Sequence, residues 1–290
     1  AVEMMKNFRN THKIEADDVM TLALQFECLG DHIVKLDTEN NHSIPLNDKE
    51  TSAFLDALND FYRQSDFRKF FDQHSDVYAN GILSFYNSVV SHIDPSWYSR
   101  FYGTQPNKDL HIVIGFASGG NYYRATRTRQ GGPEEIFSIM YYAVDNNGRP
   151  LYDKSAVGTI TEELCLSFID IENNDVKTTL EKACENVHRY TREKPIAAVT
   201  DKSIMEESLA YASAIYYLID NGSSKKSIRK AVDEGIERGF SWTPELIKRI
   251  YYYTENRKEF PTFASFYPEI IEFFKDYTAN LGKTILKVLR

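Results

Sequence analysis

The chain has 290 residues, 42% of them hydrophobic, and its 34 basic and 42 acidic residues give a formal charge of −8. This acidic balance argues against a nucleic-acid partner, because binding a polyanion requires a basic surface that displaces counterions. Three cysteines cannot all pair, so we do not expect disulfides to stabilise the fold. No apolar run approaches the roughly 20 residues of a membrane span, which argues against a membrane-spanning chain.

Helical periodicity dominates the beginning of the chain. Apolar residues recur at helical spacing over residues 17–30, which end in the typical helix stop Gly30, and again over residues 48–64 and 66–93. We therefore expect residues 1–105 to be helical. Aromatic residues in this part, as in "FYRQSDFRKFF", follow the same spacing and are interpreted as core.

The pattern changes at Asp109. Residues 110–118 and 135–145 are short β-branched and aromatic runs bounded by Gly, Asn and Pro, which predicts a small sheet over residues 109–145. We expect His111, in the first of these strands, to pair with a neighbour in the sheet.

The segment between the two predicted strands, "GGNYYRATRTRQGGP", is polar and bounded by glycines, which indicates a loop. Arg124, Arg127 and Arg129 make it locally basic. We interpret them as a solvated hairpin tip, with a contact to an anion or an acidic peptide as the functional alternative.

No further strand is evident from Thr159 onward, and residues 159–290 are expected to be helical. The predicted helices cover residues 159–170, 178–192, 201–220, 224–237, 243–257 and 262–289. Helices thus outnumber strands, and we expect a single α+β domain over residues 1–290.

The stretch "GTITEELCLSFID", residues 158–170, has the layout of a zinc-peptidase helix. Such a helix carries H-E-x-x-H, because residues four apart share a face and two imidazoles can bind one Zn²⁺. With Glu163 as the acid, the ligand positions hold Glu162 and Leu166. A leucine has no electron pair to donate, so the usual site cannot form. Thr159 and Glu162 also fit a capping box, which explains Glu162 without a metal.

Several longer stretches extend this similarity over residues 15–275. They are "NDFYRQSDFRKFFDQHSDVY", "WYSRFYG", "GGNYY", "EELCLSFID", "EESLAYASAIYY" and "GFSWTPELIKRIYYYTENRKEFPTFASFYPEI". In these stretches the chain resembles a family of uncharacterised bacterial zincin-like proteins, grouped as a domain of unknown function and mostly exported to the cell envelope. Members typically have H-E-x-x-H-S-F where this chain has "EELCLSF".

The resemblance implies a zincin-like metallopeptidase fold of the gluzincin type. It places Glu163 at the general-base position and Glu207 at the distal position for a zinc ligand. It also implies that the strand before the helix is an edge strand, on which Ile136, Ser138 and Met140 would hold an extended peptide by β-augmentation.

The chain departs from the family at both histidines. Without zinc, bound water is not acidified from about 15.7 toward about 7, and a lone glutamate is too weak a base to hydrolyse an amide. We therefore expect a catalytically inactive protein without a cofactor, which keeps a role in peptide or protein binding or in structure.

Three alternatives remain open. Glu162, Cys165 and Glu207 could form an atypical metal site that keeps peptidase activity, with Glu163 as the base. The carboxylates at positions 162, 163, 206 and 207 could bind Ca²⁺ or Mg²⁺, which prefer oxygen ligands. The 19 tyrosines and 18 phenylalanines could serve glycan binding.

The chain begins at Ala1, so we expect that an export signal or a tag was removed, and the resemblance favours export to the periplasm or cell envelope. The sequence makes no prediction about the oligomeric state.

Overall fold

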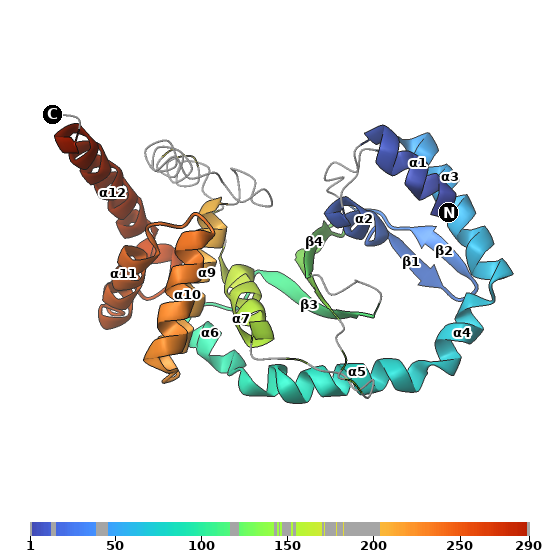
Figure 1. Ribbon diagram of the computed structural model, residues 1–290, viewed down its shortest axis with the longest axis horizontal. Helices are drawn as coiled ribbons and strands as arrows, with labels where there is room; N and C mark the ends of the chain where they lie inside the picture. Colours follow the sequence, from blue (N-terminus) through green and yellow to red (C-terminus); the bar gives the residue numbers. More distant parts are fainter. Residues whose placement is uncertain are drawn as a thin grey trace. The chain divides into compact units, whose positions relative to one another are not determined.

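The computed structural model describes residues 2–12, 16–38, 46–116, 122–141, 152, 155–169, 171 and 204–288, together with positions 144, 146, 178 and 182. Its helices and small sheets confirm the predicted α+β class (Figure 1). The expected helix over 178–192 falls almost entirely outside the described residues.

Two compact units make up the chain. Unit 1 comprises residues 1–92 and 108–157, and unit 2 comprises residues 93–107 and 158–290. That the whole chain forms a single domain stays a prediction.

Unit 1 combines helices with a hairpin and a three-stranded sheet. Its elements are α1 (Val2–His12), α2 (Ala16–Ala23), β1 (Phe26–Leu29), β2 (His32–Lys35), α3 (Asp48–Gln64), α4 (Phe67–Gln73), α5 (Ser75–Ser88), the 3₁₀ turn η1 (Val90–His92), β3 (Lys108–Gly115), β4 (Tyr123–Thr128) and β5 (Glu134–Tyr141).

The hairpin corrects the prediction that residues 1–105 are helical. The helix expected over 17–30 ends at Ala23, and β1 pairs with β2 in antiparallel register, with Leu29 opposite His32. Gly30 has φ +64° and opens the two-residue loop, the sign that a type II′ turn requires at its first central position. The same conformation suits a helix stop, which is why the sequence allowed both interpretations.

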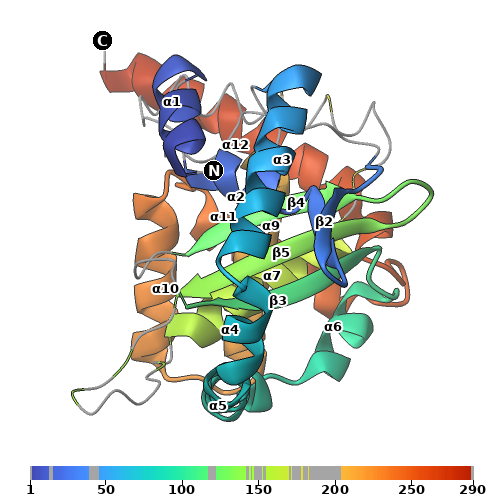
Figure 2. The ribbon, with the colours of Figure 1, turned by 90° about the vertical axis from the view of Figure 1, so that its right-hand side faces the viewer.

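The larger sheet has the strand order β3-β5-β4, and Figure 2 shows the three strands side by side. β5 runs parallel to β3 and antiparallel to β4. The prediction of a loop between two strands is therefore wrong for residues 123–128, which form β4. The prediction that β5 is an edge strand is also wrong, because β5 has a partner on both sides.

Arg127 of β4 and Arg129, directly after the strand, take part in an ion-pair network within unit 1. Arg127 donates two hydrogen bonds to Glu135, at 2.7 and 2.9 Å, and a third to the carbonyl of Leu24. Arg129 lies 3.5 Å from the same carboxylate. The predicted solvated hairpin tip is therefore wrong for Arg127, whose side chain is only 10% exposed.

His111 does pair with sheet neighbours, as predicted. Its Nε2 lies 3.2 Å from Glu135, and its ring stacks on Phe137 of β5 with a centroid separation of 4.7 Å. The guanidinium of Arg127 lies 4.8 Å from the centre of the Phe137 ring. Glu135 thus accepts contacts from cationic or ionisable groups on both neighbouring strands.

Most aromatic residues around α4 are not core, contrary to the prediction, although Tyr62 is buried as predicted. Phe61, Phe67, Phe70 and Phe71 are all exposed, each by more than a third of its surface. They contact one another or nearby rings, as in the stack of Phe71 on Tyr78 at 4.6 Å. Helical spacing identified the shared face but could not establish what covers it.

Unit 2 is a helical assembly around one buried helix. Its elements are α6 (Pro95–Tyr102), α7 (Ser155–Phe168, from residue 158), α9 (Ile204–Asp220), α10 (Lys225–Glu237), α11 (Thr243–Glu255), the 3₁₀ turn η2 (Ala264–Phe266) and α12 (Tyr267–Val288). Side chains from Glu207 to Tyr217 of α9 are buried on every face, which is characteristic of a central helix. α10 and α11 pack against it (Figure 1).

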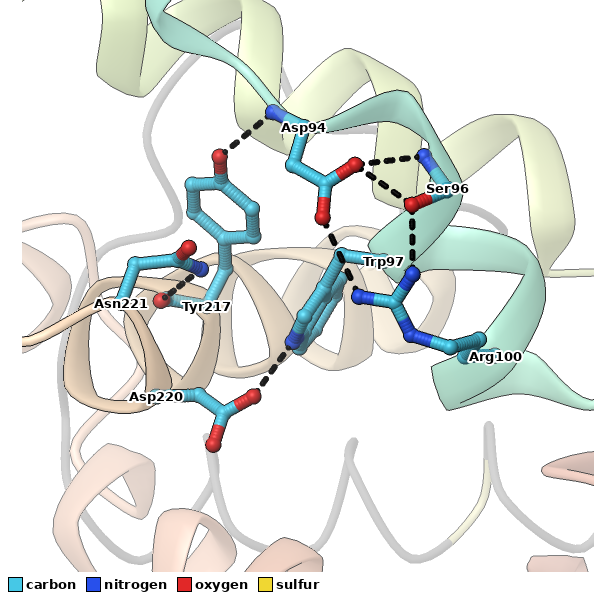
Figure 3. Close-up of polar contacts among 7 residues, drawn as sticks. All are labelled: Asp94, Ser96, Trp97, Arg100, Tyr217, Asp220 and Asn221. Carbon is cyan, nitrogen blue, oxygen red and sulfur yellow. Dashed lines mark hydrogen bonds and ion pairs between the residues drawn. The ribbon is translucent and has the colours of Figure 1, made fainter.

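Helix α6 is fixed to the C-terminal end of α9 by polar contacts (Figure 3). Asp94 caps α6 by accepting from the Ser96 amide, and its own amide donates to the hydroxyl of Tyr217. The indole of Trp97 donates to Asp220 at 2.7 Å. Trp97 also stacks on Phe101, so the same residue joins the polar contact to the aromatic core.

None of the described helices has both the length and the apolar composition that crossing a membrane requires.

The Glu135 network predicts both a stability loss and a pH effect. Hydrogen bonds from Arg127 hold the pKa of Glu135 below its usual value of 4.5. The resulting stabilisation is complete above pH 4.5 and is lost as the pH falls through the lower folded-state pKa. Glu135→Gln should lower the unfolding free energy by about 3 kcal/mol near neutral pH, because Arg127 stays buried without its carboxylate. The unfolding free energy of the variant should also fall less between neutral and acidic pH, because the variant has no carboxylate at position 135 to be protonated.

Urea unfolding at neutral and acidic pH measures both effects. The matched control is Glu134→Gln, since Glu134 lies 3.4 Å from Lys108 and its side chain is 35% exposed. We expect that variant to cost less than about 1 kcal/mol. Equal losses in the two variants would show that the Glu135 network has no special role.

Candidate functional site

Helix α7 carries two of the acidic residues that the sequence singled out, Glu162 and Glu163. It begins at Ser155, so Thr159 lies inside the helix and the predicted capping box between Thr159 and Glu162 is wrong. The helix starts earlier than the sequence suggested, because the apolar side chains of Ala156 and Ile160 are buried and extend its pattern toward the N-terminus. Glu162 therefore has a different partner.

That partner is Arg238, which follows α10 directly. Its Nη2 donates to Glu162 Oε1 at 2.7 Å and its Nη1 to Oε2 at 2.9 Å, so the pair is bidentate. The same Nη2 lies 4.0 Å from Oε2 of Glu207, in the first turn of α9. One guanidinium thus faces two carboxylates from two helices. We refer to Glu162, Glu207 and Arg238 as the acidic centre.

The local fold explains the position of Arg238. It is the C-cap residue of α10, and its amide hydrogen-bonds the carbonyls of Glu234 and Ile236. Gly239 follows with φ +91°, a conformation that lets the chain leave the helix sharply. The guanidinium then lies 4.4 Å from the ring centre of Tyr211 and 5.3 Å from that of Phe240.

Aromatic and charged groups set the electrostatics of the centre. Burial disfavours the charged form of Arg238, but its hydrogen bonds to Glu162 outweigh this effect, so the pKa of Arg238 is raised and it stays cationic. Burial raises the pKa of Tyr211 to about 12, and its hydroxyl donates to the carbonyl of Ala231. Tyr211 is therefore neutral and holds its ring against the guanidinium.

Glu163, at the predicted general-base position, is 4% exposed and lies next to Glu162 on α7. Adjacent residues of a helix point in directions about 100° apart, so Glu163 does not share the face that Glu162 presents to Arg238. The guanidinium lies against the carboxylates of Glu162 and Glu207.

The residues at the family's ligand positions do not suit a zinc ion. Both oxygens of Glu162 accept hydrogen bonds from Arg238, and Leu166 is a core residue, 7% exposed. Cys165 is fully buried, which raises the pKa of its thiol well above the usual value and keeps it protonated. Among the residues that the structure describes, no group of three or more His, Cys, Asp or Glu side chains is arranged to hold a metal.

The predicted peptide-binding residues lie in unit 1 and are buried. Ile136, Ser138 and Met140 share one face of β5, and each is at most 1% exposed. Their strand lies between β3 and β4, so its backbone is engaged on both sides. β5 therefore offers no unpaired edge to which a peptide could add along these residues.

The sequence did not identify Arg238, Tyr211 or Phe240 as part of the centre. Arg238 and Glu162 are 76 positions apart, and nothing local links them. One signal was available: buried acidic residues on predicted core helices need a compensating cation, and an arginine beside a helix-ending glycine was a candidate.

A family model described as "Domain of unknown function (DUF4932)" matches residues 9–273, which is nearly the whole chain. Neither the curated proteins nor the solved structures contain a match. The family description states no activity, so the similarity to zincins stays a prediction.

The bidentate pair makes a testable contribution to stability. Glu162→Gln should lower the unfolding free energy by about 2 kcal/mol, because the amide cannot replace the charge-assisted hydrogen bonds to a largely buried guanidinium. Urea unfolding at neutral pH measures the change. Glu234→Gln is the matched control, since Glu234 pairs with Lys230 on the exposed surface of α10, and we expect a change below about 0.5 kcal/mol. A loss no larger than that of the control would contradict the assignment.

Proposed function

The chain belongs to the DUF4932 family, and we propose that it is a catalytically inactive relative of zinc peptidases, which acts by binding a peptide or protein or in a structural role. The proposal also places it in the bacterial envelope or periplasm, on the basis of the family resemblance.

One observation carries the proposal: a guanidinium, rather than an open coordination position, faces the carboxylate of Glu162. Arg238 engages both oxygens of Glu162, at the first ligand position of the resemblance, and lies near Glu207 at the distal one. The second ligand position holds the buried Leu166. These side chains cannot arrange three ligands and a water around one zinc ion.

Without a zinc ion, peptide hydrolysis would lack its main source of catalysis. A bound zinc ion would acidify a water molecule and polarise a peptide carbonyl. Glu163 alone cannot supply either effect, because an unassisted carboxylate does not make water nucleophilic enough to attack an amide.

The same contacts weigh against an active peptidase with Glu162, Cys165 and Glu207 as ligands. Using Glu162 would require breaking its bidentate pair, and using Cys165 would require removing a proton from a fully buried thiol. Both steps oppose metal binding.

A binding role needs a surface other than β5. An extended peptide that adds to the described sheet would pair with an outer strand, β3 or β4. The exposed rings of Phe67, Phe70 and Phe71 on α4 offer an apolar contact of the kind that protein-binding surfaces use. This apolar contact supports a protein or peptide partner.

Metal analysis of the purified protein tests the proposal. We expect less than stoichiometric zinc, no peptide hydrolysis above that of Glu163→Gln, and a melting temperature that a chelator leaves unchanged, because no structural metal contributes folding energy. One zinc ion per chain, together with hydrolysis that Glu163→Gln abolishes, would refute it.

A further inference from the structure

The charges on the exposed side of helix α10 are separated by sign. The first half of the helix carries four exposed basic residues and the second half three exposed acidic residues. They are Lys225, Lys226, Arg229 and Lys230, followed by Asp233, Glu234 and Glu237. This order is unfavourable for a helix, because the helix dipole favours anions near the N-terminal end and cations near the C-terminal end. The order therefore does not serve the stability of α10 itself.

Four of these residues form a single stripe along the helix. Lys226, Lys230, Asp233 and Glu237 are separated by four, three and four positions. This spacing places side chains on one side of a helix, and paired helices use it for their mutual contact. The N-terminal half of the stripe is cationic and the C-terminal half is anionic.

The opposite side of α10 packs within unit 2. Gly235 is buried against the ring of Tyr211 of α9, and the Tyr211 hydroxyl donates to the carbonyl of Ala231. Ala231 and Gly235 lie roughly half a turn around the helix from the stripe. The stripe therefore points away from α9, and its charged side chains are exposed.

Contacts within the chain compensate these charges only weakly. Lys230 lies 3.3 Å from Glu234, and the two side chains are 74% and 49% exposed, so solvent screens the pair. A cation that precedes its anion by four positions is also the less favourable order on a helix. In the part of the chain that the structure describes, Lys226, Asp233 and Glu237 form no ion pair.

We propose that the stripe binds the same stripe of a second copy of this chain, with the two α10 helices antiparallel about a two-fold axis. One register places Lys226 opposite Glu237 of the partner subunit and Lys230 opposite Asp233 of the partner subunit, and the symmetry forms each pair twice. The centre of this register lies between Ala231 and Val232, at the middle of α10, so the helices overlap over nearly their full length.

A second copy fits both halves of the stripe, whereas an anionic surface fits only one. A polyanion or an anionic lipid surface would attract the basic half and repel the acidic half, and the chain as a whole carries a charge of −8. An antiparallel copy presents anions to the cations and cations to the anions. Its N-terminal helix end also lies beside the C-terminal end of the first helix, so the two helix dipoles attract each other.

The contact is small, because one exposed side of a 13-residue helix forms it. We therefore expect a weak dimer, with a dissociation constant between about 1 µM and 1 mM. Its stability should depend on salt, since exposed ion pairs hold it together. Raising the ionic strength from about 0.01 M to about 1 M shortens the Debye length from about 30 Å to about 3 Å, and the dissociation constant should rise by about tenfold or more.

Analytical ultracentrifugation of the full chain with two charge-reversed variants tests the inference. Lys226→Glu/Lys230→Glu makes the stripe wholly acidic, and Asp233→Lys/Glu237→Lys makes it wholly basic. Each variant alone should sediment as a monomer, because like charges face one another. An equimolar mixture of the two should form a heterodimer at least as strong as the natural dimer, because all the facing charges then have opposite sign.

Thermal unfolding checks that both variants are folded. The changed side chains are exposed, so each variant should melt within about 3 °C of the natural protein. A variant that melts much lower is replaced by its single change, Lys226→Glu or Glu237→Lys, which still places two like-charged pairs in the dimer.

The outcomes decide the proposal independently of the proposed function, which is tested by zinc content and hydrolysis. A natural protein that stays monomeric up to about 1 mM overturns the inference, as does a dimer that both variants retain. A monomer that instead binds phosphatidylglycerol vesicles would assign the basic half to an anionic surface and would also overturn it. Dimerisation that is lost in each variant and restored in their mixture supports it.

Discussion

The ion pair between Arg238 and Glu162 is the contact on which the interpretation of unit 2 depends. It links the end of α10 to α7, and through Glu207 it reaches the first turn of α9, the helix at the centre of the unit. A pair of this kind has a large desolvation cost, and it is stable only when its hydrogen bonds are well formed. The bidentate geometry and the two ring faces meet that condition.

This contact is also the basis of the proposal that the chain is catalytically inactive. A zinc peptidase of the type that the sequence resembles uses a glutamate on one helix, opposite an acidic residue of a second helix, to hold metal and water. In this chain Glu163 is buried on α7, while the neighbouring Glu162 pairs with a guanidinium and Leu166 lies in the core. An arginine can compensate carboxylates but cannot ionise water. Under the proposal, the charges of the unit are balanced without hydrolytic chemistry.

The sequence predicted the elements that depend on local periodicity. Helix α3 has the predicted bounds because Asn47 and Glu50 form a capping box in front of an amphipathic run. Helices α9 to α12 likewise begin and end within a few residues of their predicted limits. For these segments the apolar spacing and the caps agree, so the local signal was sufficient.

The failures concern features that depend on distant partners. Strand β4 is short, and its Arg127 pairs with Glu135 of the neighbouring strand β5, a partner that periodicity cannot reveal. The position of β5 between two strands depends on a parallel crossover. The role of Arg238 depends on a residue 76 positions away. In each case the physical cause is tertiary.

A double-mutant cycle between Glu162→Gln and Arg238→Gln tests the central contact most directly. If the guanidinium holds the acidic centre, the two changes will not be additive, and urea unfolding will give a stabilising coupling energy of about 2 kcal/mol. A coupling energy within about 0.3 kcal/mol of zero would contradict the account.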